Sequence, residues 1–100
     1  MNIEKSFEGK TLTLALAGRL DSSSAPDLEE TLSASLDGVE GLVIDFAKVD
    51  YLSSAGLRVL LSAQKRMAAG PGGLRLRNVN AAVRDVLDMT GFSDFLAIEA

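Results

Sequence analysis

The residues best suited to chemistry are two adjacent serines, Ser53 and Ser54, which begin a segment with helical spacing after a strand-like run. A serine at a helix start can cap backbone N–H groups that the first turn leaves unpaired. Alternatively, its hydroxyl can be phosphorylated, because the phosphate charge is favourable beside the positive end of the helix dipole. Such a phosphate would leave the fold intact and act by repelling a partner. Gly56 next to the serines either serves packing or lets the backbone of another molecule approach.

The composition removes most catalytic alternatives. The 100 residues contain no histidine, cysteine or tryptophan, which excludes a Ser-His-Asp triad, a cysteine nucleophile and zinc sites built from Cys and His. Asp21, Asp45 and Asp50 offer the oxygen ligands that Mg²⁺ prefers, so a small enzyme or nucleotide-binding protein stays as a minor hypothesis. Aspartates in loops more commonly brace turns, and residues 70–73 lack the lysine and Ser/Thr of a phosphate-binding loop. We expect no catalytic residue, no metal and no cofactor.

The charge balance limits the partners. Ten basic and 14 acidic residues give a net charge of −4, which argues against nucleic acid because phosphate binding needs a basic patch. Arg75, Arg77 and Arg84 could form a small basic patch, but arginines alternating on an edge strand more simply form a solvated face that discourages strand pairing. No apolar run approaches the roughly 20 residues that span a bilayer. We therefore expect a cytoplasmic protein that does not insert into a membrane.

The serines and aspartates must be positioned by strands and helices, and the first elements indicate a β-hairpin. Residues 11–17 alternate between leucine and small or polar residues, and residues 3–7 alternate more weakly, with turn chemistry at residues 8–10. Gly18 is expected to end the second strand, so residues 19–26 are expected to form a loop. The leucines at 28, 32 and 36 then predict a helix, and Ser24 with Asp27 has the spacing of a capping box.

The remaining elements alternate between strand and helix. Residues 42–46 form a near-continuous apolar run that is typical of a central strand. Further elements are expected as a helix over 54–69 with Leu57, Leu60, Leu61, Met67 and Ala68 facing inward, a strand over 74–77, a helix over 79–89 and a short strand or tail over 95–98. The order predicts one α/β domain over residues 1–100, with a mixed, mostly parallel sheet, an N-terminal hairpin and about three helices packed on it.

Three segments in register resemble STAS domains of the bacterial anti-sigma factor antagonist family. The segment Val49–Leu61 is similar to the family's signature, Gly18–Pro26 is similar to its Gly-x-Leu-Asp loop, and Leu42–Phe46 is similar to its central strand with a closing aspartate. The resemblance spans essentially the whole chain. Many members read Asp-Ser-Ser-Gly where this chain has Ser53 to Gly56 without the aspartate.

The resemblance implies a non-enzymatic regulator. Such a domain binds an anti-sigma factor that is also a serine kinase and thereby frees the sigma factor; the kinase phosphorylates the antagonist, and a serine phosphatase reverses the step. Ser54 matches the phosphorylated serine, with Ser53 as second choice, and ATP and magnesium belong to the kinase. The expected partner-binding surface comprises Asp21, Ser22, Ser23, Ser24, Ser53, Ser54, Ala55, Gly56 and Arg58.

Two questions stay open at this stage. The chain could be a STAS subunit of another assembly, such as a lipid-transport ATPase component or a stressosome-type scaffold. The exposed apolar residues between 79 and 95 are compatible with either a monomer or a weak dimer.

Overall fold

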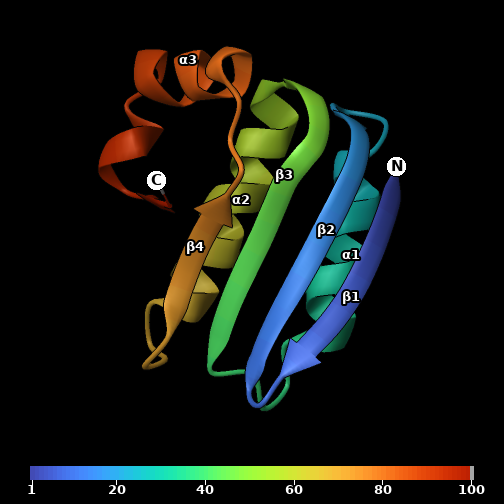
Figure 1. Cartoon of the computed structure of the whole chain (residues 1–100), viewed down its shortest axis with the longest axis vertical. Coiled ribbons are helices and arrows are strands. Elements are labelled where there is room, and N and C mark those ends of the chain that lie inside the picture. The colour runs from blue at the N-terminus through green and yellow to red at the C-terminus, as the bar shows by residue number, and fades with distance from the viewer. Residues whose placement is uncertain (100) are drawn as a thin grey trace.

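The protein alternates strands and helices along the chain, as a computed structural model that describes residues 1–99 shows (Figure 1). The hairpin strands β1 and β2 come first, and each later strand except the last is followed by a helix or helical turn. In chain order the elements are β1 (Asn2–Glu8), β2 (Thr11–Leu20), α1 (Ala25–Ser35), β3 (Gly41–Leu52), α2 (Ser54–Met67), β4 (Gly73–Arg77), α3 (Ala81–Met89), the 3-10 turn η1 (Phe92–Asp94) and β5 (Ala97–Ile98).

The sheet has its strands in chain order, β1-β2-β3-β4-β5. β1 pairs antiparallel with β2, whereas the pairs β2–β3, β3–β4 and β4–β5 are parallel. Parallel neighbours need a crossover, and α1, α2 and α3 supply those crossovers. The predicted mixed, mostly parallel sheet with an N-terminal hairpin and three helices is therefore confirmed.

The core lies between the sheet and the helices, mainly α1 and α2, and Val83 and Leu87 of α3 also belong to it. Alternate leucines of β2 and the side chains of Leu42, Ile44 and Phe46 on β3 are fully buried and pack against α1 and α2. Figure 1 shows both helices on the same side of the sheet, with the opposite face of β1 to β3 uncovered. This two-layer arrangement explains why β2 alternates while α1 and α2 carry apolar stripes.

Two strands are longer than predicted. β2 continues through Gly18 to Leu20, and β3 continues beyond Phe46 to Leu52. The register between them shifts twice, between Ala15 and Ala17 and between Gly18 and Arg19. These β-bulges disturb the period of two, so the buried Val49 and Leu52 are three residues apart and the pattern did not indicate a strand.

The helix boundaries also differ in detail. α3 begins at Ala81 rather than at residue 79, because the Asn80 side chain accepts from the Val83 N–H at 2.9 Å and so caps the helix. On α2 the expected inward residue Ala68 is exposed, while Val59 and Ala63 are buried. Within residues 1–99, no helix combines the length and apolar character needed to cross a bilayer.

Candidate functional site

The carboxyl ends of β2 and β3 lie side by side and bring two serine-containing segments together. Leu20 is paired with Leu52 at the end of the parallel register, and the Ser53 N–H donates to the Leu20 carbonyl at 2.9 Å. The β2–α1 loop (residues 21–24) and the α2 start (residues 53–56) therefore share one edge of the sheet. In open α/β sheets, ligands and partners commonly bind at this edge.

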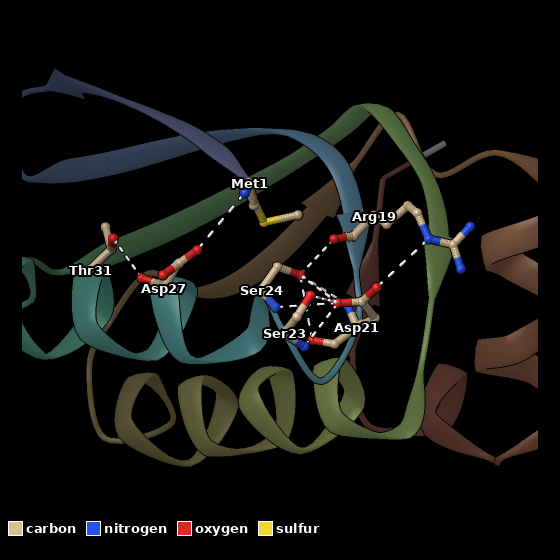
Figure 2. Close-up of polar contacts among 7 residues, drawn as sticks. All are labelled: Met1, Arg19, Asp21, Ser23, Ser24, Asp27 and Thr31. Atoms are coloured by element: carbon tan, nitrogen blue, oxygen red, sulfur yellow. Dashed lines mark hydrogen bonds and ion pairs between the residues drawn. The ribbon is translucent and has the colours of Figure 1, made fainter.

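Asp21 organises the β2–α1 loop. Its Oδ1 accepts from the Ser23 backbone N–H at 3.0 Å, from the Ser23 hydroxyl at 2.7 Å and from the Ser24 N–H at 3.3 Å, as Figure 2 shows. These bonds stabilise the charged carboxylate, so the pKa of Asp21 lies below its ordinary value, chiefly because of the Ser23 hydroxyl. The loop is consequently held by an ionised side chain at neutral pH.

Ser24 is buried and fixes the same loop from inside. Its hydroxyl donates to the Arg19 carbonyl at 2.6 Å and accepts from the Asp21 N–H at 3.0 Å. Although Ser24 precedes α1, its side chain makes no capping bond to the helix, and the carboxylate of Asp27 lies 3.8 Å from the amino nitrogen of Met1 (Figure 2). The predicted capping box is therefore wrong, because both of its side chains are engaged elsewhere.

The two serines at the α2 start have different surroundings. Ser53 is the N-cap, and its hydroxyl accepts from the Gly56 N–H at a long 3.5 Å. Ser54 is the first helical residue and is exposed, and within residues 1–99 its hydroxyl has no hydrogen-bond partner. The capping interpretation thus applies to Ser53, while the hydroxyl of Ser54 is accessible.

Gly56 anchors the α2 start to the ends of both strands. It is buried, and a Cβ atom built at this position would lie 2.7 Å from Leu20 Cγ and 2.8 Å from Leu52 Cδ1. Real Cβ atoms essentially never come so close, so only glycine fits without a shift in the core. This favours the packing interpretation of Gly56 over approach by another molecule.

The other predicted partner-binding residues are unevenly accessible. Ser22, Ser23 and Arg58 are exposed, whereas Asp21 and Ala55 are half-buried. Because Ser24 and Gly56 are buried, these two residues can affect a partner only by shaping the backbone around them.

Two functional candidates escaped the sequence analysis. Arg19 and Tyr51 pair across β2 and β3, and the Arg19 guanidinium carbon lies 4.1 Å from the centre of the Tyr51 ring. Arg19 Nε also lies 3.7 Å from Asp21 Oδ2, so the exposed arginine is held between a ring and a carboxylate. The sequence would have indicated this pair only if both predicted strands had been extended, β2 to Leu20 and β3 to Leu52.

The alternative clusters do not assemble. Asp45 braces the first bulge of β3, since its Oδ1 accepts from the Ala47 N–H at 2.9 Å and from the Asn78 side chain at 3.0 Å. Residues 1–99 contain no group of three His, Cys, Asp or Glu side chains that could hold a metal ion. The arginines also separate, because Arg75 and Arg77 pair with Glu99 while Arg84 pairs with Asp88 on its own helix.

Comparison with known families and sequences finds one matching family model and relatives assigned as anti-sigma factor antagonists. A family model described as "Mlab, STAS domain" matches residues 3–98. The chain is 39% identical over 82 residues to BtrV of Bordetella bronchiseptica, a protein assigned as an anti-sigma factor antagonist, and the match covers 81% of this chain and 71% of BtrV. It is 29% identical over 100 residues to the anti-sigma-B factor antagonist of Bacillus subtilis, covering 100% of this chain and 92% of that protein.

The fold has close counterparts among solved structures. The anti-sigma factor antagonist SpoIIAA in its unphosphorylated form superposes with a TM-score of 0.83 at 19% identity, covering 99% of this chain and 89% of that one. The phosphorylated form of this Bacillus cell fate determinant superposes with a TM-score of 0.75 at 18% identity, covering 99% and 92%. At these identities the structural likeness establishes the fold alone.

Proposed function

The chain belongs to the STAS domain family, and we propose that it is a cytoplasmic anti-sigma factor antagonist that is switched off by phosphorylation of Ser54. In this proposal it binds an anti-sigma factor that is also a serine kinase and releases the sigma factor. The relatives BtrV and the Bacillus subtilis protein, both assigned as antagonists, support the regulatory role.

One observation carries the choice of Ser54. Its hydroxyl is exposed and unengaged at the first position of α2, whereas the Ser53 hydroxyl is used as the helix cap. Modification of Ser53 would remove the side-chain cap of α2, but modification of Ser54 places a phosphate beside the positive end of a 14-residue helix. Ser54 is therefore the acceptor that the fold tolerates better.

The chain acts as substrate, and the chemistry belongs to its partner. No histidine or cysteine is available to deprotonate a serine, so the kinase supplies the base, ATP and Mg²⁺. The Ser54 oxygen attacks the γ-phosphorus, its proton passes to the kinase's base, and ADP leaves with the bond to the γ-phosphoryl group broken. A serine phosphatase then hydrolyses the phosphoserine and regenerates the hydroxyl.

The switch works by repulsion at the surface of the partner. The proposed contact surface combines exposed Ser22, Ser23 and Arg58 with the accessible parts of the β2–α1 loop and the α2 start. The ionised Asp21 lies 3.7 Å from Arg19, so its charge is largely balanced before any modification. A phosphate on Ser54 adds nearly two more negative charges and three bulky oxygens, which weakens docking while α2 stays folded.

A kinase assay with matched serine variants tests the acceptor. The anti-sigma factor kinase is recovered by pull-down from the native host and incubated with ATP and the wild type, Ser54→Ala or Ser53→Ala. We expect mass spectrometry to detect phosphate on the wild type and on Ser53→Ala but not on Ser54→Ala. Full phosphorylation of Ser54→Ala would show that Ser54 is not the acceptor.

A binding assay tests the switch itself. We expect Ser54→Asp to give the circular dichroism spectrum of the wild type but to bind the kinase about tenfold more weakly, since like charges at an interface are strongly unfavourable. Ser54→Asn is the matched uncharged control. Equal affinity of Ser54→Asp and Ser54→Asn, or loss of helical signal in Ser54→Asp, would contradict repulsion without unfolding.

A second candidate is a STAS subunit of another assembly, such as a lipid-transport ATPase component. The support is the family model, whose description carries the name Mlab. The same pull-down separates the two candidates, because recovery of an ATPase complex with no kinase favours the second, while recovery of a kinase that binds wild type better than Ser54→Asp favours the first.

A further inference from the structure

The uncovered face of the sheet carries separated charges. Because the alternate leucines of β2 face the helices, the residues between them face the other way, together with their cross-strand neighbours. We call this surface the open face. On β1 it presents the carboxylates Glu4 and Glu8, and on β4 it presents the guanidinium groups of Arg75 and Arg77. Figure 1 shows β1 and β4 on opposite sides of β2 and β3.

The centre of the open face carries mostly small side chains, with Asp45 and Lys48 of β3 as its charged members. Thr13, Ala15 and Val43 lie between the two charged strands, and Val43 is only 1% exposed although no core helix covers it. Thr13 and Val43 line a shallow hollow that has Glu8 at one side and the two arginines at the other. Since neighbouring side chains already cover Val43, a second surface would contact the half-buried Thr13 and Ala15 at the centre rather than Val43.

The charged residues lie at matching levels along the strands. The register places Glu4, Ala15, Asp45 and Arg77 in one row, and Ser6, Thr13, Val43 and Arg75 in the next. A two-fold axis that runs along the strands between β2 and β3 would bring β1 of one copy over β4 of the other. The Glu4 carboxylate would then face Arg77 of the second copy, at the same level, and Glu8 would lie within reach of its Arg75.

We infer that the open face is the interface of a weak symmetric homodimer in which β1 of each copy packs over β4 of the other. The occupant is a second copy of this chain because the face is complementary to itself: one strand is acidic and the strand related to it by the two-fold axis is basic. Within one copy, both arginines pair with the carboxylate of Glu99, Arg77 Nε at 3.3 Å and Arg75 at 3.8 Å. One carboxylate therefore balances two guanidinium groups. The acidic side chains Glu4 and Glu8 take part in no ion pair within residues 1–99.

The size of the face sets the expected strength. Four strands spaced by about 4.8 Å, with about six residues rising about 3.3 Å each, give a flat area of roughly 400 Å² per copy. A total near 800 Å² lies below the roughly 1,000 Å² that specific interfaces usually exceed, so the association should be weak. Lys48 and Asp45 also lie on this face, and the net charge of −4 opposes association, so the attraction depends on the pairing of the charged strands.

Sedimentation equilibrium of the full chain tests the inference over about 1 µM to about 1 mM protein. We expect the wild type to dimerise at about 20 mM salt and to dissociate at about 500 mM salt, where screening is short-ranged. Glu4→Arg should raise the dimer Kd by about tenfold, because each substitution acts twice across a two-fold axis. Arg77→Glu should do the same, and combining Glu4→Arg with Arg77→Glu should restore the Kd to within about threefold of wild type.

Charge-matched variants on the helices distinguish the effect of ion pairing between the two copies from the effect of net charge. Glu30→Arg on α1 and Lys65→Glu on α2 are exposed and change the net charge by the same amounts, and we expect them to leave the Kd within about threefold of wild type. Circular dichroism melts verify folding, and the double variant tests the pairing even if Arg77→Glu lowers stability.

Three outcomes would overturn the inference. The first is a wild type that stays monomeric at about 1 mM in low salt. The second is a pair of single variants that match their charge controls. The third is a dimer that is lost on Met89→Ser, which would place the interface on the exposed apolar side chain of α3 instead. The inference does not depend on the proposed function, since no partner or phosphate enters the measurement.

Discussion

The β2–α1 loop and the α2 start are neighbours at one sheet edge but are built on opposite principles. In the loop, one carboxylate accepts hydrogen bonds at 2.7 and 3.3 Å and one buried hydroxyl donates to the Arg19 carbonyl at 2.6 Å. At the α2 start a single cap bond is long, at 3.5 Å, and the Ser54 hydroxyl is exposed. The loop therefore fixes the local geometry, whereas the helix start presents an accessible hydroxyl.

Gly56→Val should produce the largest loss of stability, because it disrupts the packing of the α2 start against the ends of β2 and β3. Its branched side chain would meet Leu20 Cγ and Leu52 Cδ1, which lie within 2.8 Å of a Cβ at this position. Overpacking of this kind costs about 3 kcal/mol of unfolding free energy. Urea denaturation measures the change, with Ser54→Ala as the neighbouring control. If the Gly56→Val protein were as stable as wild type, Leu20 and Leu52 would be able to move aside at little cost.

Ser24→Ala should follow, because it removes the inner support of the loop. The Arg19 carbonyl and the Asp21 N–H would both lose a partner in a partly buried place, which costs about 1.5 kcal/mol. Exposed Ser22→Ala is the matched control, and surface changes of that kind stay within about 0.5 kcal/mol. If the two variants were equally stable, the buried Ser24 hydroxyl would not stabilise the loop, and the loop would not differ from the α2 start in this respect.

Acid should weaken the loop while leaving the α2 start unaffected. The pKa of Asp21 is depressed in the folded protein, so its contribution is fully present above the unfolded pKa near 3.8 and is lost as pH falls through the folded value. We expect Asp21→Asn to lower Tm at pH 7 and to match wild type near pH 2. Asp37→Asn, an exposed change of equal charge, controls for net charge. A Tm difference that persists unchanged at low pH would show that the carboxylate charge is not what holds the loop.

The smallest effects should come from the helix start itself. Ser53→Ala removes a long cap bond and should cost about 0.5 kcal/mol, whereas Ser54→Ala should change stability by less than about 0.5 kcal/mol in either direction. Thermal melts of the two variants in parallel measure the difference. If Ser54→Ala lost more stability than Ser53→Ala, the structural role would belong to Ser54. The case for Ser54 as the phosphate acceptor would then be weaker.

The fold was predictable wherever one periodicity persisted. The leucines of β2 and the leucine stripe of α1 identified their elements because each segment buries one continuous face. Residues 18–20 of β2 and residues 47–52 of β3 could not be found, since two bulges shift the buried positions and Gly18 sits within a strand at φ of 116°. Strand interiors rarely hold glycine, so the sequence pattern ended there.

The candidate site was predictable in part. Ser53, Ser54 and Asp21 were identified from helix-start chemistry and from family resemblance, and the sheet register brings their segments to one edge. The Arg19–Tyr51 pair was missed because it depends on the bulged register. The role of Ser24 was misjudged, because the spacing to Asp27 fits a capping box while only the folded loop directs the hydroxyl toward Arg19.

The tight fit of Gly56 against Leu20 and Leu52 also bears on how such domains can diversify. These three positions must change together or not at all, because any side chain at 56 collides with both leucines. The exposed Ser22, Ser23 and Arg58 lie beside this locked group and carry no comparable packing constraint. Duplicated copies of the gene could therefore acquire different partners by substitution at these outer positions, while the frame that presents the serine is inherited unchanged.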